Sequence, residues 1–459
     1  MLQQKQEQMN EQQEQEQEQQ AQSSIGRHDS HVNTNRNDYV SASVNKLRHL
    51  EHLQTRKNHI IKQENSCADH LAMTRRKQNH KNKNSFEAVL SSKQQSHSTF
   101  KGVSPTISME PRQDSKGVTG LANMRNTCYL NAALQALRHN TEVTAFFLEG
   151  HHTKFIEKKK PTVKTQLVLG YADLLKSLWS GSYPAYVRPE GFIQSMLPAA
   201  KAAGFDHFLI PDQHDSHEFI TFLLDQLHEG MAEEVNIEII RPTPVTNKDK
   251  AIQQALEAWK RSFSKQYSPL TEMIYGLFRV TITCKTCGNH SNNWETFNCL
   301  KMPIPQTIGE EAPTIHSMLK EEFKDEEIEG YACDHCKPNR CVAIRSTRIW
   351  RMPRMITMSV KRFTMDGRKI HTTMKMDETK DLSFKEFFSS DSSEPSQFQK
   401  YECFAIVDHH GSSGGGHYTA QAKSPLTEQW HLFDDEKAMK IENPIFGNNT
   451  YVMFLKPSS

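Results

Sequence analysis

Two Cys-x-x-Cys pairs, CKTC at 284–287 and CDHC at 333–336, constrain this chain more than any other feature. A tight turn within each pair directs both sulfurs to one point, so the two pairs suit the two halves of a tetrahedral Zn²⁺ site. The predicted ligands are Cys284, Cys287, Cys333 and Cys336. The 45 residues from 288 to 332 exceed the spacing of a compact zinc ribbon, and His335 and Cys341 are nearby alternative ligands. Four thiolates leave no open coordination position, so the predicted zinc is structural.

Residues 1–115 differ in composition from the rest of the chain. The first 22 residues are half glutamine, and a basic run, TRRKQNHKNK, occupies 74–83. Such segments bury too little apolar surface to offset their ordering entropy, and the mean hydropathy of the whole chain, −0.70, is low. We therefore expect a disordered tail over 1–115. The basic run is interpreted as a solvated linker, with a nuclear-import or nucleic-acid patch as the alternative.

Charge and cysteine content limit the classes of protein to consider. A net charge of +2 gives no overall electrostatic reason to expect nucleic acid or a membrane surface as a partner. The N-terminus lacks a secretory pattern, and no apolar run approaches the roughly 18 residues that a membrane span needs. Nine cysteines, an odd number, favour metal ligands, a nucleophile and buried thiols over a disulfide framework. We expect an intracellular protein of the nucleus, the cytoplasm or both.

Apolar periodicity and turn signals begin near residue 116 and continue nearly to the end, which predicts one large folded unit at 116–458. Apolar residues at three- and four-residue spacing predict helices through most of 128–239. Stretches rich in β-branched and aromatic residues predict strands from 275 onward. Helices followed by strands indicate an α+β architecture.

Cys128 lies between a polar turn and an apolar helical stripe. Asn123, Asn126 and Thr127 are turn and N-cap residue types, and the helical face begins at Leu130. The predicted helix N-terminus favours the thiolate, which is the nucleophilic form of cysteine. A structural cysteine at a helix start is the alternative.

The best candidate for a base is His417, which follows three glycines and opens a predicted strand. Asp434 and Asp435 end another strand-like run, WHLFDD, where a carboxylate could accept the second imidazole N–H and set the tautomer. Adjacent aspartates alone are more often a solvated turn. Together with Cys128, these residues indicate a nucleophile, a base and an orienting acid.

These motifs resemble those of the ubiquitin-specific proteases. GLANMRNTCYLNAALQ resembles the cysteine box of that family, and YECFAIVDHHGSSGGGHYTAQAK, WHLFDDEKAMKI and TYVMFL resemble its histidine box. QHDSHEF at 213–219 also fits, and the resemblance covers about 116–456. It implies a papain-like cysteine protease fold with a helical thumb, a β-rich palm and zinc-braced β fingers inserted at about 275–345.

The resemblance also implies the roles of the site residues. Cys128 would be the nucleophile of a deubiquitinase, His417 the general base and acid, and Asp434 the residue that orients the histidine. Asn123 matches the amide that stabilises the oxyanion, and Asp435 supports the same site. The expected reaction is hydrolysis of the (iso)peptide bond after the C-terminal glycine of ubiquitin through an acyl-enzyme.

Other residues are expected to contact the partners of the protein. Asp215 and Gln213 match the stretch that contacts the ubiquitin tail, although Asp215 also fits a helix N-cap. Ubiquitin and ubiquitinated proteins are the implied partners, and the N-terminal tail could engage a recruiting complex. Arg125 departs from the glycine usual in the family, and it would be strained if the turn requires a positive φ. The alternative function is an inactive ubiquitin-binding scaffold.

Overall fold

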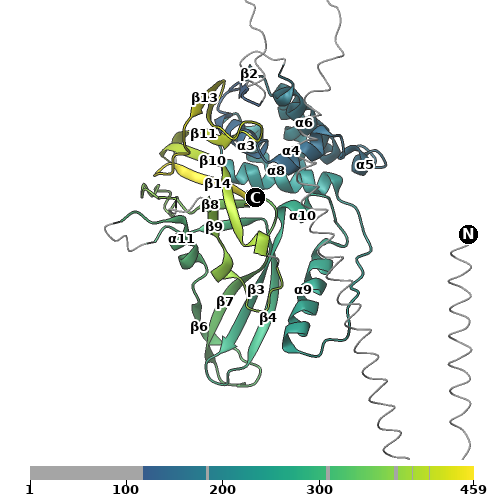
Figure 1. The fold of residues 1–459 in the computed structure, drawn as a ribbon, viewed down its shortest axis with the longest axis vertical. Coiled ribbons are helices and arrows are strands. Elements are labelled where there is room, and N and C mark those ends of the chain that lie inside the picture. The colour runs from purple at the N-terminus through teal and green to yellow at the C-terminus, as the bar shows by residue number, and fades with distance from the viewer. Residues whose placement is uncertain are drawn as a thin grey trace, which may run out of the picture. The chain divides into compact units, whose positions relative to one another are not determined.

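The computed structural model describes residues 117–181, 186–305, 311–376, 381–394, 396–412 and 414–458. The tail predicted over 1–115 lies outside these residues, as does Cys67. Within them, helices come first and two sheets follow, in the order expected for an α+β chain (Figure 1).

Helices fill the first part of the described chain. Their bounds are α3 (Cys128–Leu137), α4 (Thr141–Leu148), α5 (Thr153–Ile156), α6 (Val163–Trp179), α7 (Glu190–Ala202), a 3₁₀ turn η3 (Asp206–Leu209) and α8 (Ser216–Met231). Side-chain caps define several of their starts, because each satisfies a backbone N–H that the first turn leaves unpaired. Asn140 accepts from Val143 N at 2.9 Å, and Thr162 forms a reciprocal capping box with Thr165.

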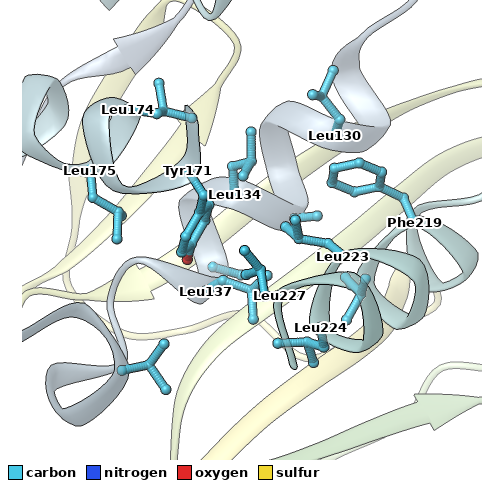
Figure 2. Close-up of a cluster of buried hydrophobic side chains, with 14 of the residues drawn as sticks. Leu130, Leu134, Leu137, Tyr171, Leu174, Leu175, Phe219, Leu223, Leu224 and Leu227 are labelled. Atoms are coloured by element: carbon cyan, nitrogen blue, oxygen red, sulfur yellow. The ribbon is translucent and has the colours of Figure 1, made fainter. Parts of the chain in front are cut away.

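The centre of the helical part is a leucine-rich contact between α3, α6 and α8 (Figure 2). Leu130, Leu134 and Leu137 lie along the face of α3 that the apolar spacing predicts. The side chains shown opposite them come from α6 (Tyr171, Leu174, Leu175) and α8 (Phe219, Leu223, Leu224, Leu227). Every residue of α3 is buried, so the helix that begins at Cys128 is fixed on all sides.

A large sheet packs against α3 through its central strands. Its strands are β5 (Cys299–Met302), β8 (Ile356–Val360), β9 (Asp381–Ser383), β10 (Lys400–Ser412), β11 (Gly415–Lys423), β12 (Trp430–Asp434), β13 (Lys437–Ile441) and β14 (Thr450–Pro457). The spatial order is β13-β12-β11-β10-β14-β8-β5, with β9 beside one end of β10. All of its neighbours are antiparallel except β5 and β8. The strands predicted around the histidine motif are therefore central members of this sheet.

A second sheet of four strands extends away from the helices (Figure 1). It contains β3 (Gly276–Cys284), β4 (His290–Phe297), β6 (Glu326–Tyr331) and β7 (Cys341–Arg351), in the order β4-β3-β7-β6. Helix α9 (Asn247–Phe263) runs alongside it and packs Trp259 against Trp350 and Leu277. Both cysteine pairs lie in the turns at the far end of this sheet.

The remaining elements are short. They are β1 (Gly120–Leu121), β2 (Tyr186–Val187), α10 (Thr271–Ile274), α11 (Ile315–Glu322), η4 (Lys385–Phe387) and η5 (Ser396–Phe398). The parallel pairing of β1 with β2, together with the bond from Leu121 N to Asp435 O at 2.8 Å, places the segment before Cys128 next to the end of β12. Among the residues described, none of the helices combines the length and the apolar character that a membrane crossing needs.

Candidate active site and metal centre

Helix α3 begins at Cys128, as the sequence predicts, but the turn before it is not capped in the expected way. Thr127 occupies the N-cap position without a side-chain bond to the first turn. Its hydroxyl instead accepts from Met124 N at 2.8 Å, and its backbone N–H donates to Asn123 Oδ1 at 3.2 Å. These bonds close a compact turn that presents Cys128 at the first helical position.

The turn requires two successive residues in the left-handed region. Arg125 has φ 74° and Asn126 has φ 53°. Asparagine tolerates this region better than most residues, and its Nδ2 donates to Pro211 O at 3.3 Å. Arginine has no such compensation, and the left-handed conformation costs an L-residue about 1–2 kcal/mol. The positive φ on which the predicted strain at Arg125 depends is therefore present.

Burial dominates the electrostatics of Cys128. The residue is 4% exposed, and desolvation raises the pKa of its thiol above the ordinary value. The backbone N–H groups of Tyr418 and Tyr129 act in the opposite direction, and the charge of Asp435 adds to the rise in pKa. We expected the helix N-terminus to favour the thiolate, but burial outweighs the N–H groups. Arg125 is not among the largest causes of this pKa shift.

His417 and Asp434 are brought together by adjacent strands. His417 is the third residue of β11, Asp434 ends β12, and His417 Nε2 lies 2.7 Å from Asp434 Oδ1. Both side chains are partly exposed, at 42% and 37%. Because Nε2 is taken by the carboxylate, Nδ1 is the ring nitrogen available to a substrate or nucleophile. The N–H···S contact of Tyr418 with Cys128 places the thiol beside the next residue of the same strand.

Asp435 links the cysteine turn to the end of β12. Its Oδ2 accepts from Asn123 Nδ2 and its Oδ1 from Asn131 Nδ2, both at 2.8 Å. Glu436 Oε1 accepts the backbone N–H of Asn123 at 2.9 Å. Asp435 itself has φ 46°, which directs the chain back along β13. Sequence reasoning missed Asn131 and Glu436, although the acidic run DDE at 434–436 was a visible signal.

The residues of the QHDSHEF stretch lie beside the same strands. Asp215 caps α8 by accepting from Glu218 N at 2.9 Å, so the N-cap interpretation is confirmed. Its second oxygen accepts from Tyr451 OH at 2.5 Å. Gln213 Oε1 accepts the backbone N–H of Gly416 at 2.7 Å, next to His417.

The four predicted metal ligands meet at the end of the second sheet. Ligand atoms of Cys284, Cys287, Cys333 and Cys336 all lie within 4.8 Å of one another. The Sγ atoms are 3.9 Å apart in the Cys284–Cys336 pair and 3.6 Å apart in the Cys287–Cys333 pair. A tetrahedron with Zn–S bonds of 2.3 Å has edges of about 3.8 Å. The spacing of the sulfurs therefore fits a tetrahedral zinc ion.

The backbone of the knuckles supports this fit. Gly288 N donates to Cys284 O at 2.9 Å, and Gly288 has φ 71°, which a side chain would resist. The backbone N–H of Cys287 lowers the pKa of Cys284 to about 6, whereas the bond to the Cys287 thiol raises the pKa of Cys336, so the thiolate is favoured at Cys284 and disfavoured at Cys336. Cys341 is buried beside the cluster, but its thiol contacts Asn339 O. The described geometry thus selects Cys336 as the fourth ligand over Cys341.

Comparison with known proteins agrees with this arrangement. Residues 119–455 match the family model of the ubiquitin carboxyl-terminal hydrolases. Ubiquitin carboxyl-terminal hydrolase 2 of Rattus norvegicus is 27% identical over 372 residues, which cover 77% of this chain and 57% of the relative. The Gallus gallus protein of the same name is 28% identical over 356 residues, covering 75% of this chain and 94% of the relative. This chain thus spans little more than half the length of the mammalian relatives that it matches.

A solved structure shows the same fold. The SAGA Ubp8/Sgf11/Sus1/Sgf73 DUB module bound to ubiquitin aldehyde contains a chain that superposes with a TM-score of 0.57 at 21% identity. The match covers 77% of this chain and 72% of that one. The helical part corresponds to the expected thumb, the eight-stranded sheet to the palm and the four-stranded sheet to the fingers. With its motifs, its fold and the match to the family model, the chain belongs to the ubiquitin carboxyl-terminal hydrolase family and, within it, to the ubiquitin-specific proteases.

Proposed function

We propose that this protein is a deubiquitinating thiol protease that hydrolyses the (iso)peptide bond after the C-terminal glycine of ubiquitin. The observation that carries the proposal is the 2.7 Å contact of His417 with Asp434, on two strands that pack against the helix beginning at Cys128. The 2.7 Å contact orients the imidazole, and the Tyr418 amide ties its strand to the thiol. Acyl transfer of this kind requires an orienting acid, a base and a nucleophile, and we assign these roles to Asp434, His417 and Cys128.

His417 acts first, as a general base. Because burial raises the pKa of Cys128, its thiol is mainly protonated before substrate binds. Nδ1 of His417 removes the proton as sulfur attacks the carbonyl carbon of the terminal glycine, and the π electrons move to the carbonyl oxygen. Asp434 holds the imidazolium that forms. The proton then passes from His417 to the leaving amine as the C–N bond breaks.

Hydrolysis completes the cycle. Water loses a proton to His417 as it attacks the thioester carbon. The C–S bond then breaks and releases the carboxyl group of ubiquitin, and the sulfur takes the proton from His417, which regenerates Cys128. Asn123 stabilises the oxyanion in both halves of the reaction. One N–H of its Nδ2 group is engaged by Asp435 at 2.8 Å, which orients the amide and leaves the second N–H for the oxyanion.

Asp215 and Gln213 are proposed as contacts of the ubiquitin tail. Asp215 is held in place by Glu218 N and Tyr451 OH, one bond to each oxygen. A carboxylate accepts further bonds through its remaining lone pairs, so a cationic side chain of ubiquitin could be bound without breaking the N-cap. The pre-existing bonds make the acceptor rigid before ubiquitin arrives.

The four-cysteine cluster is proposed to hold structural Zn²⁺. A bound ion would link the turns after β3 and β6 at the end of the fingers, far along the chain from Cys128. When bound, the metal supplies a cross-link and no open position for substrate. Its residues therefore stabilise the ubiquitin-facing fingers rather than take part in the reaction.

We further propose the domain division expected from composition, with a tail over 1–115 and the protease over 116–458. In this proposal the tail engages a recruiting complex, and the protein acts on ubiquitinated proteins in the nucleus, the cytoplasm or both. Deleting residues 1–110 should leave kcat on a minimal ubiquitin substrate unchanged. A large loss of kcat would show that the deleted residues belong to the folded enzyme.

A catalytically inactive ubiquitin-binding scaffold is the second candidate, because Arg125 has a left-handed backbone three residues before the nucleophile. Release of a fluorophore from the C-terminus of ubiquitin separates the two functions. The protease hydrolyses this amide and Cys128→Ala abolishes the hydrolysis, with Cys403→Ala as a matched control at a buried thiol on β10. Ubiquitin binding without turnover would select the scaffold.

A further inference from the structure

We propose that Gln213 is a positioning residue that fixes the strand start carrying His417, an inference that rests on the proposed function. Gln213 Oε1 accepts the backbone N–H of Gly416 at 2.7 Å, across 203 positions of sequence. Gly416 immediately precedes His417. The contact therefore acts on the backbone from which the imidazole projects, and it exists without ubiquitin.

The backbone N–H groups of Gly416 and Tyr418, on either side of His417, point to the same edge of β11. His417 pairs with His410 of β10, and successive amides of a strand point to opposite edges. The amides on either side of His417 therefore share the other edge, where Gly416 donates to Gln213 and the backbone N–H of Tyr418 lies near enough to the Cys128 thiol to lower its pKa. Gln213 thus faces the amide of the residue before His417, and Cys128 faces the amide of the residue after it.

The start of β11 pairs with β10 along one edge, but its other edge has no neighbouring strand within the described part of the chain. Strand β12 pairs only with residues 420–423 of β11, so it supplies no acceptor for the Gly416 amide. Glycine is required at 416, because a Cβ there would lie 2.3 Å from His409 Nε2 and 2.5 Å from His410 O. Glycine has the greatest backbone freedom of any residue. The hydrogen bond from Gly416 N to the side chain of Gln213 limits the backbone freedom of the three glycines at 414–416.

Hydrogen bonds also hold the segment around Gln213. Its backbone N–H donates to Asp212 Oδ1 at 2.7 Å. Two residues later, Asp215 is fixed by Glu218 N and by Tyr451 OH of β14. Helix α8 and strand β14 therefore fix the backbone two residues after Gln213, whereas the exposed side chain of Gln213 is held by its bond to Gly416.

The test compares Gln213→Met, which has similar length but no acceptor, with Gln213→Glu, which keeps the acceptor. Gln166→Met, on the exposed face of α6, is the matched control. The main readout uses no ubiquitin: the rate at which iodoacetamide alkylates Cys128, followed by mass spectrometry across pH. The second readout is kcat for the ubiquitin amide, and the third is ubiquitin affinity in the Cys128→Ala background.

In Gln213→Met, we expect alkylation near neutral pH and kcat both to fall about tenfold, the order of one hydrogen bond, whereas loss of the proposed contact with the ubiquitin tail alone would lower only ubiquitin affinity. Gln213→Glu should restore most of both rates, and Gln166→Met should change neither. Wild-type alkylation in Gln213→Met, or a loss confined to ubiquitin affinity, would overturn the proposal. If wild-type protein does not process ubiquitin while its alkylation still depends on Gln213, the proposed function fails and the positioning role stands.

Discussion

The Arg125→Gly variant should be more stable than the Arg125→Ala variant. This reverses the usual order, in which alanine is more stabilising than glycine. At φ 74°, a side chain costs about 1–2 kcal/mol, whereas glycine avoids this strain. Glycine is ordinarily less stabilising than alanine by about 0.5–1 kcal/mol because of its freedom in the unfolded chain. At the midpoints of these two ranges, Arg125→Gly is more stable than Arg125→Ala by about 0.75 kcal/mol, and the limits of the difference are about 0 and about 1.5 kcal/mol.

Urea unfolding of the metal-loaded full chain measures this difference. The matched pair is Glu157→Gly and Glu157→Ala, because Glu157 is exposed and has φ −57°. There alanine should be the more stable variant by about 0.5–1 kcal/mol. The same order at both positions would refute the strain argument. Activity of Arg125→Gly should match that of the native enzyme, since Arg125 does not set the pKa of Cys128.

Three further predictions concern the base, the metal centre and a buried acid. His417→Ala should slow acylation by about 10²–10⁴-fold in single-turnover kinetics, because the proposed general base is removed, and normal turnover would mean that the base is misassigned. Joint replacement of Cys333 and Cys336 by serine should remove zinc and lower the thermal midpoint, whereas a metal-free native protein by elemental analysis would contradict the site. Burial raises the pKa of Asp408 to about 6, so between pH 4 and 6 the native state keeps a proton that the unfolded chain releases. Its contribution to stability therefore falls as pH rises through this window. Asp408→Asn should lack that fall in urea midpoints measured at pH 4.5 and 6.5, and identical pH profiles for variant and native protein would show that Asp408 does not carry this titration.

Local features of the sequence predicted the local parts of the site. The start of α3 at Cys128 follows from turn-forming residues before an apolar stripe, and both signals lie within fifteen residues. The order of His417 and Asp434 on neighbouring strands follows from two short strand patterns with a turn between them. Each cysteine knuckle was predictable because its Cys-x-x-Cys spacing is local. The long segment between the two knuckles, which must bring them together, was not predictable in this way.

What the sequence could not predict depends on contacts between distant segments. The bond from Gly416 N to Gln213 spans 203 positions, and that from Asn123 N to Glu436 spans 313. The direction of the Cys128 pKa also needs the packed structure, because it depends on how completely α3 is buried. Helix α9 escaped prediction since much of its buried face is alanine, which contrasts weakly with polar neighbours.

The central claim is that Cys128 attacks the C-terminus of ubiquitin. The most direct measurement is intact mass after incubation with ubiquitin bearing a C-terminal thiol-reactive group, for the native chain and for Cys128→Ala. We expect one covalently attached ubiquitin on the native chain and none on the variant. Retained ubiquitin binding without an adduct on the native chain, or an equal adduct on Cys128→Ala, would contradict it.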